Sequence, residues 1–355
     1  MSTNMFINLR SDTQTLPTEE MLEKMRHAPL GDDVFREDPT VNQLEELASE
    51  KLGKEATLFV ASGTMGNLCA LMSHTRPGDE VILEADSHTY YYEVGGFSAL
   101  AGLSPRLVSG ENGIMTVEMI KKVMRPKDIH FPPSTLLCIE NTHNRGGGTV
   151  YPLTLMDEIA QYAHEQGLKV HVDGARIFNA AVALGVEAKE LVKNADSVMF
   201  CLSKGLSAPV GSLLVGEQAF IDRARKVRKM LGGGMRQAGV LAAAGIVALE
   251  KMIDRLAEDH ANARYIAEEL VKVRGIKIDL NTVQTNMIYV NISQLRVSVS
   301  RLFELLKEQG ILVSPVPPDK IRLVTNRHVS KEDAGRAVEI IKKVIENNLA
   351  VSEFQ

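Results

Sequence analysis

The chain has few cysteines and none in a metal-binding arrangement. Its 355 residues include three, Cys69, Cys138 and Cys201, which lie far apart in apolar stretches. The sequence has no CxxC pair and no His/Cys cluster with metal-ligand spacing, so we expect buried thiols in a reducing compartment and no bound metal. These features predict a cytoplasmic protein.

The sequence also lacks long hydrophobic runs and an excess of positive charge. Its longest nearly unbroken apolar stretch, 238–249, is too short to cross a bilayer, which takes about 20 residues. The N-terminal residues lack the apolar core of a secretory leader. The formal net charge is −5, whereas nucleic-acid binding draws on clustered positive charge, and the basic run 223–229 fits a solvated helix face. We therefore expect neither a membrane nor nucleic acid as a partner.

Short apolar runs alternate with helical patterns from about residue 43 onward. Fully apolar strands separated by helices predict an α/β fold with a mostly parallel sheet covered on both faces. The expected strands are 57–61, 81–83, 135–139, 169–172, 197–201 and 212–215, and the expected helices include 42–51, a segment around 68–72, and 155–163.

The pattern changes near residue 250. We predict a large domain over residues 1–250, with an N-terminal arm at 1–20, and a smaller α+β domain over 251–355. In the smaller domain we expect helices at about 251–273, 298–309 and 330–348, and strands at 277–280, 287–290 and 321–324.

Small and hydroxyl-bearing residues mark the junction between the first strand and its helix. This segment, 61–67, includes Ser62, Gly63 and Thr64. The N-terminus of a helix is an anion site and suits a phosphate. An ordinary N-cap explains the same residues, because Ser and Thr favour that position.

An acid and a base follow the apolar strand 169–172. Asp173 is placed at the carboxyl end of the strand, where open α/β sheets form their ligand crevice, and Arg176 lies three residues on. The two side chains could pair with each other or face a ligand. On the same strand His171 is interpreted as a packed core histidine. For His143, in an earlier loop, two alternatives remain: it lies near the site, or it is an ordinary loop residue.

A lysine ends a later strand. The run 197–201 leads into a Ser-Lys-Gly turn that contains Lys204. A lysine held at a strand end can form an imine with an aldehyde, although many lysines in such places are simply solvated.

The three motifs together match the needs of pyridoxal phosphate. Its phosphate needs a helix terminus, its pyridinium nitrogen needs a carboxylate, and its aldehyde needs a lysine. Through these motifs the sequence resembles the low-specificity L-threonine aldolases. These are pyridoxal phosphate enzymes of fold type I with a large and a small domain. The resemblance covers nearly the whole chain and rests on segments 8–13, 31–33, 62–67, 84–88, 129–132, 140–144, 171–176, 201–205, 232–237 and 321–325.

The resemblance implies a role for each matching residue around the cofactor. Lys204 is the Schiff-base lysine, Asp173 the partner of the pyridine nitrogen and Arg176 the donor to the phenolic oxygen. The phosphate is implied to lie against Ser62, Gly63 and Thr64.

Five more residues match the family's groups around the substrate and the phosphate. His88 is implied to stack on the cofactor and is the favoured base, and His130 lies on the hydroxyl side of the substrate. Ser11 and Arg322 are implied to bind the substrate carboxylate, and Arg236 a phosphate, in its own or a neighbouring subunit.

By the same resemblance the chain is a lyase of amino-acid metabolism. It is implied to cleave L-threonine or L-allo-threonine to glycine and acetaldehyde as a homotetramer with active sites near subunit interfaces. The alternatives are an aldolase of the phenylserine type, a β-eliminating lyase, and a pyridoxal phosphate binder without catalysis. One segment departs from the family: Phe35-Arg36 stands in an acidic loop where we expect Tyr-Gly.

Overall fold

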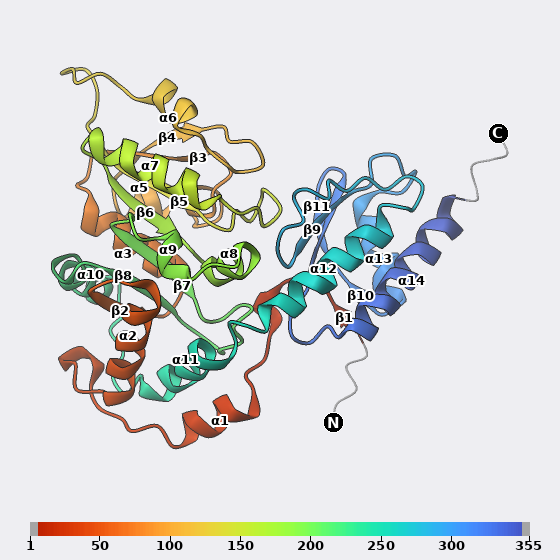
Figure 1. Ribbon diagram of the computed structural model, residues 1–355, viewed down its shortest axis with the longest axis horizontal. Coiled ribbons are helices and arrows are strands. Elements are labelled where there is room, and N and C mark those ends of the chain that lie inside the picture. The colour runs from red at the N-terminus through yellow and green to blue at the C-terminus, as the bar shows by residue number, and fades with distance from the viewer. Residues whose placement is uncertain (1–5, 350–355) are drawn as a thin grey trace. The chain divides into compact units, whose positions relative to one another are not determined.

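The computed structural model describes residues 6–349, which form two compact units (Figure 1). The larger unit spans Leu16–Asp254. The smaller unit combines the residues from Arg255 onward with the described residues 6–15. The sequence pattern instead predicts those N-terminal residues as an arm of the large domain. They belong to the smaller unit because strand β1 (Ile7–Asn8) pairs in parallel with β10 (Ile311–Leu312), a two-residue match too short to leave a pattern.

A seven-stranded sheet forms the centre of the larger unit. Its order is β2-β8-β7-β6-β5-β3-β4, and β8 runs antiparallel to both of its neighbours while the other pairs are parallel. The predicted α/β fold with a mostly parallel sheet is confirmed. The strands are β2 (Ala56–Val60), β3 (Glu80–Glu84), β4 (Ser104–Val108), β5 (Ser134–Glu140), β6 (Lys169–Asp173), β7 (Ser197–Cys201) and β8 (Ser212–Gly216).

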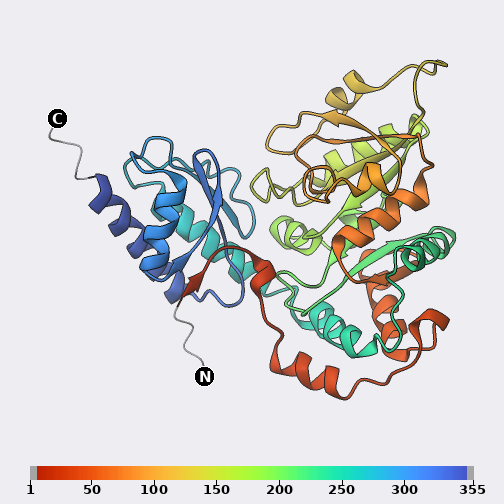
Figure 2. The same cartoon turned by 180° about the vertical axis from the view of Figure 1, so that it is seen from behind.

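Helices cover both faces of this sheet, as Figures 1 and 2 show from opposite sides. On one face α3 (Gly63–His74) and α10 (Gln218–Met230) bury a core that includes Met199 of β7. On the other face Ser49 of helix α2 (Pro39–Leu52) bonds Thr57, and Phe178 of helix α8 (Ile177–Leu184) packs on Phe200. The remaining helices of this unit are α1 (Glu19–Arg26), α4 (His88–Tyr91), α5 (Gly96–Ala99), α6 (Val117–Val123), α7 (Leu153–Glu165), α9 (Ala188–Leu191) and α11 (Gly239–Lys251), with 3₁₀ turns at Asp12–Gln14 in the smaller unit and at Asp33–Phe35.

The smaller unit is the expected α+β arrangement. Its antiparallel sheet has the order β11 (Ser314–Val316), β12 (Lys320–Val324), β9 (Met287–Asn291), with helices α12 (Leu256–Leu270), α13 (Val299–Glu308) and α14 (Lys331–Leu349). The predicted strand at 277–280 is wrong. Lys277 makes one isolated bridge, and the carboxylate of Asp279 accepts the N–H of Asn281 to form a turn instead.

All three cysteines are buried free thiols, as expected. Burial raises the pKa of Cys69 to about 12, so this thiol is unreactive near neutral pH. Over residues 6–349 no helix combines the length and the apolar character needed to span a membrane.

Arg36 occupies a backbone conformation that suits glycine, the residue expected at this position. Its φ is 61°. We predict that Arg36→Gly raises the free energy of unfolding by about 0.5–1 kcal/mol, because relief of the left-handed strain exceeds the added freedom of the unfolded chain. Denaturant unfolding measures this. Glu37→Gly is the control, because the neighbouring Glu37 does not have a positive φ, and this variant should be less stable than wild type. An equal loss of unfolding free energy in both variants would contradict the prediction.

Candidate active site

Asp173 is a buried carboxylate at the carboxyl end of β6. Its side chain accepts hydrogen bonds from the amide of Asn67 at 2.8 Å, the backbone N–H of Ala175 at 3.1 Å and, at 3.5 Å, the hydroxyl of Thr89. Only 3% of the residue is exposed, and these three donors are neutral. A buried carboxylate held by neutral donors is suited to a cationic ligand.

Lys204 lies three residues beyond the end of β7, the strand next to β6. It opens a tight turn in which the Ser207 N–H donates to the Lys204 carbonyl at 2.9 Å. Lys204 and Arg176 line the same small cavity, together with Gly174 and Cys201. The structure therefore brings the predicted lysine and arginine together at the edge of the sheet that carries Asp173.

The N-terminus of α3 faces the same edge. Ser62 caps the helix by accepting the Met65 N–H at 3.2 Å. A Cβ on Gly63 would lie 3.0 Å from Cys201 Sγ, so glycine lets the helix end pack directly on the end of β7. Ser62 and Thr64 are exposed. The first N–H groups of this helix have no intrahelical acceptor and can bind an anion.

His88 stands at the start of α4 and is oriented by two carboxylates. Its Nδ1 lies 3.0 Å from Glu93 Oε1, and its backbone N–H donates to Glu140 Oε2 at 2.6 Å. Burial alone would lower the pKa of His88, but the hydrogen bond to Glu93 and the charge of Asp173 outweigh it, so the pKa is raised. Because Nδ1 faces Glu93, Nε2 is the nitrogen left to exchange a proton with a substrate.

His143 lies between Glu140, which bonds the backbone of His88, and a further buried acid, Glu84. Its Nε2 lies 3.0 Å from Glu84 and 3.8 Å from Glu140. Burial opposes the charged form, but the two carboxylates raise its pKa. Its Nδ1 accepts the Gly146 N–H at 3.0 Å, so the ring proton lies on Nε2 and is directed at Glu84. His143 therefore holds the buried acids beside His88 in place.

Sequence reasoning missed three of the polar residues in this cluster: Asn67, Glu93 and Glu140. Asn67 was inside a recognised motif but had no role of its own. Glu93, 6% exposed, is an isolated acid between tyrosines and glycines. Its position five residues after His88 is the one local signal that could have found it.

His130 does not join the cluster in its own chain. It lies in the loop before β5, its side chain is 82% exposed, and it bonds Asp128. The cluster lies at the other end of β5, where Glu140 pairs with Asp173. The seven residues of β5 separate these ends by about 20 Å.

Arg236 follows the glycine run that lies against the first turn of α3. A Cβ on Gly233 would lie 2.4 Å from Met65 Sδ, which shows how closely the two segments approach. The guanidinium of Arg236 pairs with Asp32 at 2.8 Å and lies over the exposed ring of Phe35. It is half exposed and available to a further anion.

Ser11 and Arg322 lie together in the smaller unit. Arg322 on β12 donates to the backbone carbonyl of Arg10 at 3.2 Å, and Arg10 directly precedes Ser11. Ser11 accepts the Thr13 N–H at 3.2 Å. The structure thus brings the two predicted carboxylate-binding residues side by side.

Comparison with known proteins identifies the family. Residues 8–293 match the family model described as beta-eliminating lyase. The chain is 46% identical over 327 residues to the low specificity L-threonine aldolase of Escherichia coli strain K12, covering 92% of this chain and 95% of that one. It is 45% identical to the probable low-specificity L-threonine aldolase 2 of Arabidopsis thaliana, covering 95% and 97%.

Solved structures share the fold. A threonine aldolase of Leishmania major superposes with a TM-score of 0.83 at 20% identity, covering 95% of this chain and 99% of that one. A putative L-allo-threonine aldolase of Listeria monocytogenes gives 0.81 at 22% identity, covering 96% of both chains. The sequence matches, which extend over most of its length, show that this chain belongs to the beta-eliminating lyase family, in the group of low-specificity L-threonine aldolases.

Proposed function

We propose that this chain is a pyridoxal phosphate-dependent lyase that cleaves L-threonine and L-allo-threonine to glycine and acetaldehyde. The observation that carries the proposal is Asp173, a buried carboxylate with neutral donors at the sheet edge where Lys204 and the α3 N-terminus also lie. The relatives named as threonine aldolases support this choice of reaction.

The residues present fit the cofactor. Asp173 would hold its pyridine nitrogen in the protonated form, and Lys204 would bond its aldehyde carbon. Arg176, in the cavity that Lys204 lines, would donate to the phenolic oxygen. The phosphate would lie at the open N-terminus of α3, against Ser62, Gly63 and Thr64, within reach of a guanidinium such as that of Arg236.

When bound, the cofactor supplies an electron sink for the carbanion left at Cα when the Cα–Cβ bond breaks. The protein's own residues decide which bond breaks. A guanidinium such as Arg322, with Ser11, grips the substrate carboxylate and fixes the orientation of the Cα bonds. His88 takes the β-hydroxyl proton on Nε2 while Glu93 holds Nδ1.

A kinetic comparison of the purified holoenzyme on the four threonine stereoisomers tests the reaction. Acetaldehyde and glycine should form in equal amounts from the two L-isomers, with phenylserine as a further substrate for comparison. The family model's name raises β-elimination as the competing reaction. Pyruvate and ammonia from L-serine, without acetaldehyde from L-threonine, would show that the chain catalyses β-elimination instead. Bound cofactor without turnover of any of these substrates would show that the chain binds pyridoxal phosphate without catalysis.

We also propose a homotetramer in the cytoplasm, with His130 serving the site of another copy. Support comes from the place of His130 at the far end of β5, exposed in a loop. Mixing inactive Lys204→Ala chains with His130→Asn chains should restore roughly a quarter of the wild-type activity, because random pairing then assembles sites with both residues. If the mixture has only the summed activity of the two separate variants, His130 does not serve the site of another copy. Light scattering measures the number of subunits in the assembly.

A further inference from the structure

A chain of hydrogen bonds runs beneath the sheet edge from His74 to the two carboxylates of the site. His74 Nε2 lies 2.7 Å from Ser197 Oγ, which lies 2.8 Å from His171 Nδ1. His171 Nε2 lies 3.1 Å from Asn67 Oδ1. The Asn67 amide nitrogen in turn lies 2.8 Å from Asp173 Oδ2 and 2.8 Å from Glu93 Oε1. Nothing in the proposed chemistry uses His171, Ser197 or His74.

The chemistry of the groups fixes the direction of every bond. Two carboxylate oxygens face the nitrogen of Asn67, so that atom is the amide NH₂ and Oδ1 is the acceptor toward His171. His171 therefore carries its proton on Nε2. Its Nδ1 then accepts the hydroxyl proton of Ser197, and Ser197 accepts from Nε2–H of His74.

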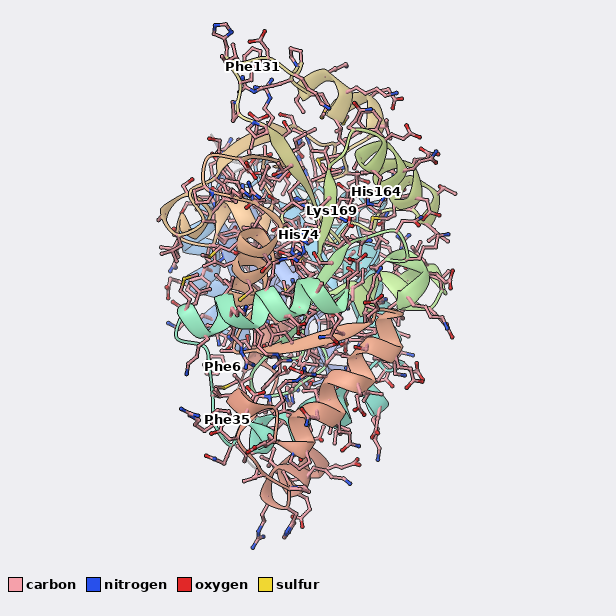
Figure 3. All side chains as sticks on the ribbon, turned by 90° about the vertical axis from the view of Figure 1, so that its left-hand side faces the viewer. Phe6, Phe35, His74, Phe131, His164 and Lys169 are labelled. Atoms are coloured by element: carbon pink, nitrogen blue, oxygen red, sulfur yellow. The ribbon has the colours of Figure 1, made fainter. Side chains whose placement is uncertain are left out.

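Both histidines are neutral, which this direction requires. Burial lowers the pKa of His171 to about 4, and this residue is fully enclosed. Burial lowers the pKa of His74 to about 3, and a positive charge on His171 would lower it further. His74, labelled in Figure 3, is faced by Lys169 and Arg223, which favour its neutral form, and by Asp196, which opposes it.

We propose that Asn67 and His171 are positioning residues that keep the Asp173 carboxylate ionised and aimed at the pyridine nitrogen of the cofactor. The inference rests on the proposed function. Asp173 and Glu93 share the Asn67 amide, and burial together with the charge of Asp173 raises the pKa of Glu93. One amide donor to each stabilises both negative charges without adding a cation that would compete with the pyridinium. The hydrogen bond that His171 Nε2–H donates to Asn67 Oδ1 prevents the amide from turning its oxygen toward the acids.

Removing the His171 donor should therefore weaken the hold on the cofactor. In His171→Leu the Asn67 oxygen loses its partner, the amide can flip, and a proton moves onto the acid pair. The dissociation constant of pyridoxal phosphate should rise about tenfold or more. The pH midpoint of the visible absorption should move up by about one unit, because an unprotonated pyridine ring withdraws less charge from the Lys204 nitrogen that is bonded to the cofactor.

Three further variants separate positioning from general destabilisation. His171→Gln, whose amide can donate to Asn67, should recover most of the lost affinity and of the midpoint. Asn67→Asp, which replaces both donors by a third acid, should exceed His171→Leu in both effects. His260→Leu removes a half-buried histidine of the smaller unit, whose pKa is also lowered to about 4 by desolvation, and should not move the midpoint.

The outcomes distinguish this inference from the proposed function. A wild-type protein that binds no pyridoxal phosphate would overturn the proposed function itself. A wild-type protein that binds it, with an unchanged midpoint in both His171→Leu and Asn67→Asp, would overturn the positioning role alone. Equal losses in His171→Leu and His171→Gln would show that the imidazole acts through packing and would also overturn it.

Discussion

Replacing Lys204 by alanine should abolish the visible absorption of bound pyridoxal phosphate and reduce amino-acid cleavage by several orders of magnitude. The visible band requires a nitrogen bonded to the cofactor's aldehyde carbon, and Lys204 is the lysine that lines the cavity beside Arg176. Without that bond an amino acid must condense with the free aldehyde of the cofactor and release water, instead of exchanging with the lysine nitrogen already bonded there, so turnover falls as well. Absorbance spectra after reconstitution and an acetaldehyde assay measure both effects.

Lys169→Ala is the matched control. Lys169, labelled in Figure 3, opens β6 at the end opposite Asp173, and its ammonium pairs with Asp196 at 2.6 Å. Its removal should leave both the band and the turnover close to wild type. A visible band that persists in Lys204→Ala would mean that another amine binds the cofactor, and the cofactor assignment built on Lys204 would be lost.

The strands and the cofactor motifs could be predicted because their signals are local. Each central strand is a short apolar run, and a buried parallel strand needs little more than that. Asp173 and Lys204 each stand at the end of such a run. Since the carboxyl ends of parallel strands meet at one edge, strand assignment was enough to bring the two residues together.

The polar support of the site could not be predicted, because each contact depends on a partner distant in the chain. Asn67 bonds Asp173 across more than a hundred positions, and Glu140 reaches the backbone of His88 across fifty-two. His171 was interpreted as a core histidine, which its burial bears out, but the interpretation missed its bond to Asn67. Residue type alone does not reveal which buried polar groups pair.

The grouping of residues 6–15 failed for a related physical reason. β1 has two residues, and its pairing partner β10 is some three hundred positions later. Neither strand is long enough to show the alternation by which strands are recognised. The side chain of Leu9 is fully buried in the core of the smaller unit and anchors the segment there.

His88→Asn should lower kcat for L-threonine by about 10² to 10⁴ while the visible band of the cofactor remains. Loss of a positioned general base has this size, and asparagine cannot take the hydroxyl proton although it can still donate to Glu93. His164→Asn, on the surface beside Asp196, is the control and should keep wild-type kcat. A kcat within twofold of wild type in His88→Asn would assign the proton to another base.

The pH profile of Glu93→Gln tests whether His88 is the base, because a base must be neutral to accept a proton. The raised pKa of His88 means that cleavage by the wild type is lost, as the pH falls, at a higher pH than an ordinary histidine would give. Glutamine keeps the acceptor for Nδ1 but removes the negative charge that raises this pKa. The acidic limb of kcat should therefore move to lower pH in Glu93→Gln, and no such limb should remain in His88→Asn. A limb that stays in place in Glu93→Gln would show that the group titrating there is not the imidazole that Glu93 orients.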